Sequence, residues 1–244
     1  MTKSLGIAIE LIPYSESSYI IKALTREKAQ ISIIAKGWRK KKEPLLRFVE
    51  YDFCLLEPKE EGLYTLKELC LVKDFSNYPS SATWAAAEAG AELISKIIFP
   101  ISEAVDYYTL LRDYLAYLQK LHHNAILIFW RLISRIFKMM GINMDLDLCD
   151  ICQSPSTPAA LGQSGNLICM SCYQQSLDTG EYLPLSATAR QVLSLLPQIG
   201  NHVENIKLDK GVIQELNKVF LDYYSAHNKQ TLKLKSLSVL SQFY

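Results

Sequence analysis

The sequence predicts an α+β multidomain protein, in which a small N-terminal β-barrel precedes an all-helical domain with an inserted four-cysteine zinc knuckle. Three observations carry this prediction. Short β-rich runs separated by turn residues fill the chain to about residue 75, and a helical period replaces them after the Tyr-Pro-Ser-Ser cluster at 78–81. Two C-x2-C pairs then interrupt the helical half. We expect a barrel domain at 1–78 and a helical domain at 79–244 containing a metal insertion at 145–175.

The composition is typical of a packed globular protein, with 244 residues, 49% of them hydrophobic, and a formal net charge of +1. The start of the sequence has no basic region leading into a long apolar core. The most apolar run, 125–130, ends at Arg131, far short of the roughly 20 residues that a membrane span needs. We therefore expect a cytoplasmic protein without membrane contact, in which a local basic patch would have to hold any nucleic acid.

Five candidate strands lie in the first part of the chain, at 5–12, 18–24, 30–35, 47–56 and 63–74. Five strands in about seventy residues is the size of an OB-fold, a barrel that often carries single-stranded nucleic acid on one face. Glu50 and Asp52 alternate with apolar residues, which predicts one buried and one solvated strand face. Cys54 and Cys70 have no cysteine at ligand spacing, so we expect both to be small buried residues.

A basic loop, A-K-G-W-R-K-K-K-E at 35–43, connects the third and fourth strands. Cations in such a loop neutralise phosphates, and an aromatic among them stacks on a base without reading sequence, each stack being worth roughly 1–3 kcal/mol. Alternatively, the lysines are an ordinary solvated loop and the tryptophan packs back onto the barrel. The DNA-binding candidates are Lys36, Trp38, Arg39, Lys40, Lys41, Lys42 and Arg47.

Helical periodicity predicts helices at 81–98, 102–121, 124–140, 186–196 and 209–226, with a last short helix within 232–244. Ser81 or Thr83 is expected to cap the first helix, and Ser186 the fourth. The broad apolar stripes of these helices predict one packed helical core.

The segment 124–140 is apolar nearly all round, apart from one serine and three cations on one face. Arg131, Arg135 and Lys138 stand at i, i+4 and i+7, so they form a stripe on the helix. A stripe on so apolar a helix either lines a groove with apolar walls or is an ordinary exposed face. The groove would suit an acidic, hydrophobic peptide, so these three residues are our partner-binding candidates.

Cys149, Cys152, Cys169 and Cys172 form C-x2-C-x16-C-x2-C, the spacing of a four-thiolate metal site. Each C-x2-C turn can aim two sulfurs at one point, and zinc is the expected ion. A tetrahedral zinc with four thiolate ligands has no open position, so the site is predicted to be structural. An iron–sulfur cluster and a pair of disulfides fit the same spacing and remain alternatives.

The sequence contains no phosphate-binding P-loop, no nucleophile elbow and no metalloprotease motif. The four histidines have no acidic or cysteine neighbours at working spacing, and we expect them at the surface or at helix ends. We therefore expect no enzymatic activity. Two function classes remain: a nucleic-acid-binding protein, and a zinc-stabilised protein–protein scaffold with incidental nucleic-acid affinity.

Several stretches together resemble the RecO family of bacterial recombination mediators. They are P-Y-S-E-S at 13–17, T-R-E-K-A-Q-I-S at 25–32, A-K-G-W-R-K at 35–40, G-I-N-M-D-L-D-L-C-D-I-C at 141–152 and L-K-S-L at 234–237. Family members commonly have a glycine where Ser15 stands and a proline near Asn143 and Met144, and some lack the cysteines.

The resemblance implies a DNA repair protein that binds single- and double-stranded DNA and anneals complementary strands. It also implies that RecR and the single-stranded-DNA-binding protein are partners in placing RecA on DNA, with the protein at the nucleoid during repair. The cationic helix would help to receive the acidic C-terminal tail of the single-stranded-DNA-binding protein, and by position Arg131 is the residue carried over.

Overall fold

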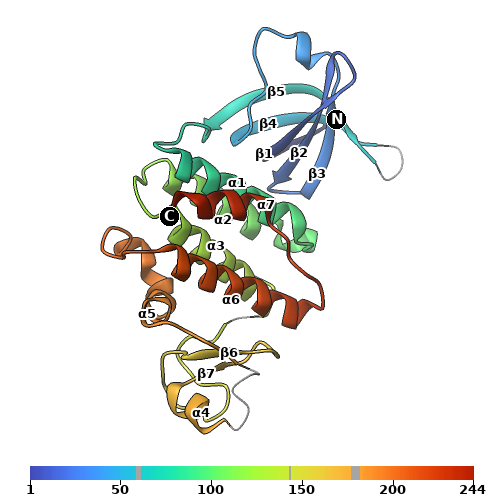
Figure 1. Ribbon diagram of the computed structural model, residues 1–244. Helices are drawn as coiled ribbons and strands as arrows, with labels where there is room; N and C mark the ends of the chain where they lie inside the picture. Colours follow the sequence, from blue (N-terminus) through green and yellow to red (C-terminus); the bar gives the residue numbers. More distant parts are fainter. Residues whose placement is uncertain (59–61, 143, 177–181) are drawn as a thin grey trace. The chain divides into compact units, whose positions relative to one another are not determined.

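The computed structural model describes residues 1–58, 62–142, 144–176 and 182–244 (Figure 1). Contacts between residues divide the chain into two compact units. The first consists of residues 1–87 and 91–121, and the second of residues 88–90 and 122–244. The predicted domain boundary after residue 78 stays a prediction, as does the extent of the metal insertion; Asn143 of the family-like run lies outside the described residues.

The first unit contains a closed five-stranded barrel with the strand order β1-β2-β3-β5-β4 (Figure 1). Its strands are β1 (Thr2–Tyr14), β2 (Ser18–Thr25), β3 (Ala29–Ala35), β4 (Val49–Leu56) and β5 (Tyr64–Asp74). Neighbouring strands are antiparallel, except for the short parallel pairing of β3 with β5. The predicted OB-like barrel is therefore confirmed, with all five strands within about three residues of their expected ends.

The turn between β1 and β2 contains Ser15, where members of the family that the chain resembles commonly have glycine. Ser15 has a φ of 57°, in the left-handed region that glycine enters without steric cost. A family glycine at this position suits that turn, and the serine adopts the same backbone at some energetic cost.

The prediction that Glu50 lies on a solvated face of β4 is wrong, because Glu50 is buried at 2% exposure. The reason is α2 (Ala104–Leu118), which follows α1 (Ser81–Lys96) and supplies two partners for this carboxylate. Arg112 Nε lies 3.1 Å from Glu50 Oε1, and the Tyr108 hydroxyl donates a short hydrogen bond to the same oxygen. Burial, with Glu50 as acceptor, raises the pKa of Tyr108 above its ordinary range, so the hydroxyl keeps its proton and donates.

The Glu50 cluster should contribute strongly to the stability of the first unit. Glu50→Ala leaves the Tyr108 hydroxyl and the Arg112 guanidinium without their shared acceptor, so we expect a loss of about 3–5 kcal/mol in the free energy of unfolding. Asp52→Ala is the matched control, because Asp52 stands two residues along β4 and its ion pair among the described residues is a 3.9 Å contact with Lys3 near the surface. Urea unfolding should show a loss below about 1 kcal/mol for the control; equal losses would contradict the prediction.

Two further expectations for the first unit are corrected. Cys54, on β4, is half-buried. Cys70 is exposed because most residues of β5 after Leu66 face solvent. The N-cap of α1 is Ser80, whereas Ser81 or Thr83 was predicted. Ser80 Oγ accepts the Thr83 N–H at 3.2 Å and Thr83 Oγ1 accepts the Ser80 N–H at 3.1 Å, which together form a capping box.

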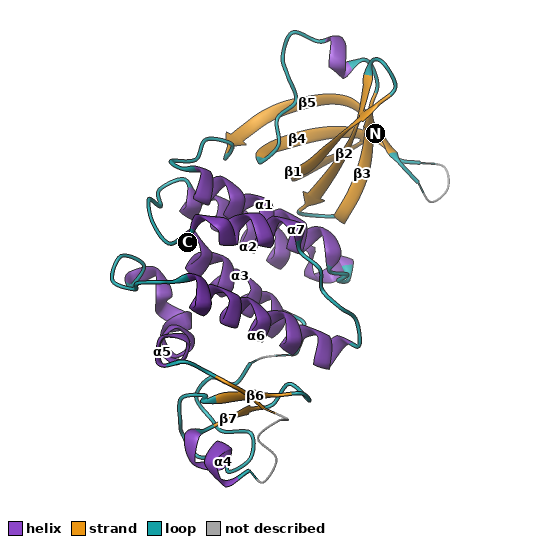
Figure 2. Ribbon diagram, viewed as in Figure 1, coloured by secondary structure: helices purple, strands orange, loops and turns teal. Residues whose placement is uncertain are grey.

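The second unit is built around α3 (Ala125–Met139) and α6 (Lys210–Asn228), which pack side by side (Figure 2). Trp130 Nε1 donates to Asn217 Oδ1 at 2.9 Å, and the Phe137 ring contacts the rings of Phe220 and Tyr223. The shorter α5 (Ala187–Leu195), capped by Ser186 as predicted, and α7 (Lys235–Leu240) complete the expected helices. In the described part of the chain no helix has both the length and the apolar character needed to cross a bilayer.

Candidate nucleic-acid interface, metal centre and partner groove

The metal insertion carries a small sheet of order β7-β6-β8 and the short helix α4 (Met170–Gln175) (Figure 2). The strands are β6 (Ala160–Gly162), β7 (Leu167–Ile168) and β8 (Tyr182–Pro184). Asp150 joins the two cysteine pairs, because its N–H donates to the Leu167 carbonyl at 2.9 Å and its carboxylate accepts the Leu167 N–H. The loop between the pairs therefore folds back on itself, as a single metal centre requires.

The four cysteine sulfurs all lie within 4.8 Å of one another. The Sγ atoms of Cys152 and Cys169 are 3.9 Å apart, close to the roughly 3.8 Å expected between thiolates bound to tetrahedral zinc with Zn–S bonds of about 2.3 Å. Backbone N–H groups also point at sulfur, from Cys169 to Cys149 Sγ at 3.3 Å and from Cys172 to Cys169 Sγ at 3.4 Å. All four are free thiols, which disfavours the disulfide alternative; an iron–sulfur cluster stays open.

The surroundings of the cluster shift the pKa values of Cys152 and Cys172 in opposite directions. The N–H and hydroxyl of Ser154 lower the pKa of Cys152 to about 6. Burial, followed by the neighbouring sulfurs, raises the pKa of Cys172 to about 12. Metal binding requires thiolates, so a bound cation would displace the protons that these thiols carry. The residues thus fit a closed divalent metal site.

In the basic loop, Trp38 opens a short 3-10 helix, Trp38–Lys40, after Gly37 with a φ of 77°. Its side chain is 9% exposed and belongs to the barrel core. Lys41 Nζ lies 3.3 Å from the centre of the Trp38 ring, a cation–π contact. The structure therefore favours packing over base stacking for Trp38, and Lys41 covers that ring.

Two of the predicted cations are bound to the barrel. Arg39 donates from Nη1 to the Ser15 carbonyl at 2.6 Å, and this contact ties the basic loop to the β1–β2 turn. Arg47 Nε donates to the Ile9 carbonyl at 3.0 Å, where β1 has a bulge, and its guanidinium lies over the Phe48 ring. Arg39 remains exposed, whereas Arg47 is half-buried and serves the barrel backbone.

Lys36, Lys40 and Lys42 are exposed, and no ion pair holds them among the residues that the structure describes. They are the part of the predicted set that is available to phosphate. Tyr14 is a further candidate that the sequence analysis did not include; it is 51% exposed at the end of β1, next to Ser15, whose carbonyl accepts a hydrogen bond from Arg39. The signal that could have found it is an aromatic residue within the polar run at 13–17.

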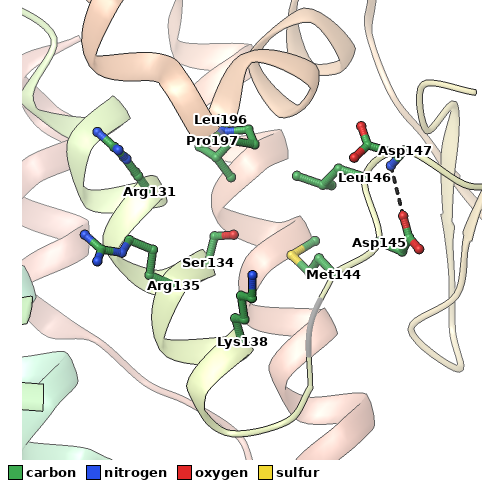
Figure 3. Close-up of a pocket in the computed structure, with 10 residues that line it drawn as sticks. All are labelled: Arg131, Ser134, Arg135, Lys138, Met144, Asp145, Leu146, Asp147, Leu196 and Pro197. Carbon is green, nitrogen blue, oxygen red and sulfur yellow. Dashed lines mark hydrogen bonds between the residues drawn. The ribbon is translucent and has the colours of Figure 1, made fainter. Parts of the chain in front are cut away.

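Arg131, Arg135 and Lys138 line one groove of about 630 Å³ within the second unit, here called the partner groove (Figure 3). The cations and Ser134 come from α3, and the opposite wall comes from the chain that leads into the first cysteine pair. The remaining lining residues are Met144, Asp145, Leu146, Asp147, Leu196 and Pro197. The three predicted partner residues therefore lie together, and the groove alternative is the one that the structure favours.

The partner groove is electrically asymmetric. Arg131 and Arg135 stand at one side, and Asp145 and Asp147 at the other (Figure 3). Within the described residues no ion pair joins these two sides. Apolar side chains lie between them, so a ligand with a carboxylate and an apolar side chain matches the half of the groove that α3 forms.

Comparison with known proteins adds an independent observation. The family model "Recombination protein O N terminal" matches residues 1–75, and "Recombination protein O C terminal" matches residues 80–237. The chain belongs to the RecO family. The resemblance noted from short stretches is thus confirmed over nearly the whole length, and the gap between the two RecO models falls just before the cap of α1.

Curated relatives agree with this assignment. The chain is 25% identical over 255 residues to the DNA repair protein RecO of Syntrophus aciditrophicus, covering 98% of this chain and 95% of the relative. It is 21% identical over 243 residues to the DNA repair protein RecO of Caldanaerobacter subterraneus subsp. tengcongensis, covering 97% of each. The protein of the same name from Halalkalibacterium halodurans is 24% identical, with 98% and 94% covered.

Proposed function

We propose that this RecO-family protein is a non-enzymatic recombination mediator in DNA repair. It binds single- and double-stranded DNA, anneals complementary strands and, with RecR, helps to load RecA onto DNA coated by the single-stranded-DNA-binding protein. The observation that carries this proposal is the basic loop on the OB-like barrel, where Lys36, Lys40 and Lys42 are exposed and unpaired among the described residues. Family membership supports the repair role.

Annealing needs no bond to be made or broken by the protein. It requires that the repulsion between two phosphate backbones be screened while the bases stay free to pair, which the exposed lysines of the basic loop can do without reading sequence. Tyr14, at the end of β1, is an exposed aromatic residue next to Ser15, whose carbonyl accepts a hydrogen bond from Arg39. Trp38 contributes by holding the loop to the barrel core.

The partner groove is the proposed receptor for the acidic C-terminal tail of the single-stranded-DNA-binding protein. Its cations can pair with carboxylates, and its apolar lining can take a hydrophobic side chain of the same peptide. The four cysteines are proposed to hold one structural zinc. The protein would act in the cytoplasm, at the nucleoid while repair proceeds.

The test is an annealing assay with complementary oligonucleotides, bare or coated with the single-stranded-DNA-binding protein. A mediator should accelerate annealing of both kinds of strand, and its affinity for single strands should fall steeply as salt rises. The alternative, a protein–protein scaffold with incidental nucleic-acid affinity, should bind DNA little at any salt concentration. No acceleration of either kind of strand would reject the mediator.

Arg131→Ala should separate the partner groove from the basic loop. A charge-assisted hydrogen bond in a partly desolvated site is worth on the order of 1.5–3 kcal/mol, so affinity for a short acidic peptide with a free C-terminal carboxylate should fall about tenfold or more. Binding of bare single-stranded DNA should not change. Fluorescence anisotropy with a labelled peptide and a labelled oligonucleotide measures both affinities.

Lys210→Ala is the control for this variant, because Lys210 is an exposed cation of the second unit outside the partner groove. It should leave both affinities unchanged. Loss of DNA binding in Arg131→Ala would mean that the stripe contacts DNA, and an unchanged peptide affinity would return Arg131 to an ordinary exposed helix face.

A further inference from the structure

We propose that the metal insertion positions one wall of the partner groove, so that metal binding controls affinity for the acidic peptide, with Asp145 as the positioning residue. The proposal rests on the peptide-binding role of the partner groove and adds a function to a metal site that is otherwise only structural. Figure 3 shows the arrangement, with α3 on one side and the chain bearing Met144, Leu146 and the two aspartates on the other.

The wall opposite α3 is a short approach to the first cysteine pair. Met144 and Leu146 are buried, at 4% and 8% exposure, so their side chains are fixed against the second unit and still line the groove. Cys149 follows Leu146 by three residues. Because only two residues separate Leu146 from Cys149, a displacement of Cys149 also displaces the wall of the groove.

Asp145 connects the groove wall to the first cysteine pair. Its Oδ1 accepts the N–H groups of Asp147 and Leu148, each at 3.0 Å, which closes a turn just before Cys149. That carboxylate is thus occupied by backbone donors, although it lies on a groove expected to bind acidic ligands. Its negative charge opposes such a ligand, so a role in shape explains its position better than a role in direct binding.

The same turn is joined to the residues that follow the first cysteine pair. Ser156 N–H donates to the Asp147 carbonyl at 2.8 Å, and Leu148 pairs with Pro155 as an isolated β-bridge. Cys149 N–H donates to the Ser154 carbonyl at 3.1 Å. The groove wall and the loop holding Cys149 and Cys152 are therefore one hydrogen-bonded structure.

Metal binding stabilises this structure because the sulfurs of Cys149 and Cys152 meet those of Cys169 and Cys172 within 4.8 Å. Without the ion, the metal–sulfur bonds that would hold all four sulfurs at one point are lost, and the two cysteine pairs stay joined by weaker contacts, such as the hydrogen bonds between Asp150 and Leu167. The first pair is then held less firmly, and so is the approach segment with Met144 and Leu146. The expected result is a groove with its cationic side intact and its apolar wall displaced.

Substitutions at Asp145 distinguish position from charge, because the two effects have opposite signs. Asp145→Ala removes a negative charge, which alone would tighten binding of an acidic peptide. It also removes both turn hydrogen bonds, which should weaken binding if the wall must be positioned. Asp145→Asn removes the charge but keeps an oxygen acceptor at Oδ1, so it should bind the peptide at least as tightly as the unaltered protein.

The experiment measures anisotropy of a labelled acidic peptide with the full chain in three metal states: as purified, after chelation, and after zinc is restored. Chelation and, separately, Asp145→Ala should each lower peptide affinity about fivefold or more, because chelation removes the metal that anchors the first cysteine pair and Asp145→Ala removes the two hydrogen bonds of the turn before it. Restored zinc should recover the affinity, and Asp145→Asn should lose none. Single-stranded DNA affinity should stay unchanged, and Asp145→Ala should retain the metal content of the unaltered protein.

Tighter peptide binding by Asp145→Ala, or unchanged affinity after complete metal removal, would overturn the proposal while leaving the partner groove standing. If chelation unfolds the second unit by circular dichroism, Asp145→Ala decides, because that variant keeps the metal. If the metal-loaded protein binds no acidic peptide, the proposed groove function fails and this inference fails with it.

Discussion

Replacing Lys36, Lys40 and Lys42 together with alanine is expected to weaken binding to all DNA sequences by a similar factor. Phosphate contacts carry no sequence information, and each one adds about 0.7 to the salt slope for single strands and about 0.9 for duplex DNA. The slope of log affinity against log salt should therefore fall by roughly 2 to 3 units, which corresponds to a loss of about 30-fold for single strands near 0.2 M salt. Titrations at several salt concentrations measure it.

The choice of these three lysines follows from the contacts of the basic loop. Arg39 is bound to the Ser15 carbonyl and Lys41 covers the Trp38 ring, so replacing either changes the loop as well as its charge. The control replaces three exposed lysines elsewhere, Lys67, Lys207 and Lys210, and removes the same total charge. A slope that is unchanged in the loop variant, or that falls equally in both variants, would move the DNA site away from the basic loop.

The five barrel strands and the six long or terminal helices were predictable because they depend on local patterns, whereas α4 and the three short strands of the metal insertion were not predicted. Alternation with period two marked five strands, and apolar periodicity marked the helices, each within about four residues of the observed ends. The metal cluster was equally predictable, since C-x2-C spacing fixes the geometry within each pair and the loop between the pairs only has to return. The three cations of α3 share a face for the same reason, their spacing along one helix.

What the sequence missed depends on residues that are far apart in the chain. Glu50 is buried because Tyr108 and Arg112, on a helix more than fifty residues later, supply its partners. Arg47 follows a basic stretch, yet its guanidinium donates a hydrogen bond to the Ile9 carbonyl, at a bulge in β1 that the alternation pattern does not predict. The partner groove could not be predicted for the same reason, because tertiary packing brings the wall from Met144 to Asp147 opposite α3.

Cys149→Ser should abolish stoichiometric metal binding and destabilise the second unit while the barrel stays folded. A structural zinc site typically contributes about 10–16 kcal/mol of binding free energy, and most of it is folding free energy for the segment that holds the ligands. The described part of the insertion has a small core, in which Ala160 and Ile168 pack against Cys149 and Cys169, so two metal ligands are themselves core residues. The described residues of the barrel contribute no cysteine to the cluster, and the barrel has a separate core.

Metal analysis of the freshly purified chain should therefore find one zinc per molecule, and Cys149→Ser should have none. The second unit of the variant should unfold at a lower denaturant concentration than that of the unaltered protein, whereas single-stranded DNA binding by the barrel should persist. Cys70→Ser is the matched control, because its thiol is exposed on β5 and lies outside the cysteine cluster. Iron in place of zinc would favour the cluster alternative, and absence of both metals from the unaltered protein would reject the metal site.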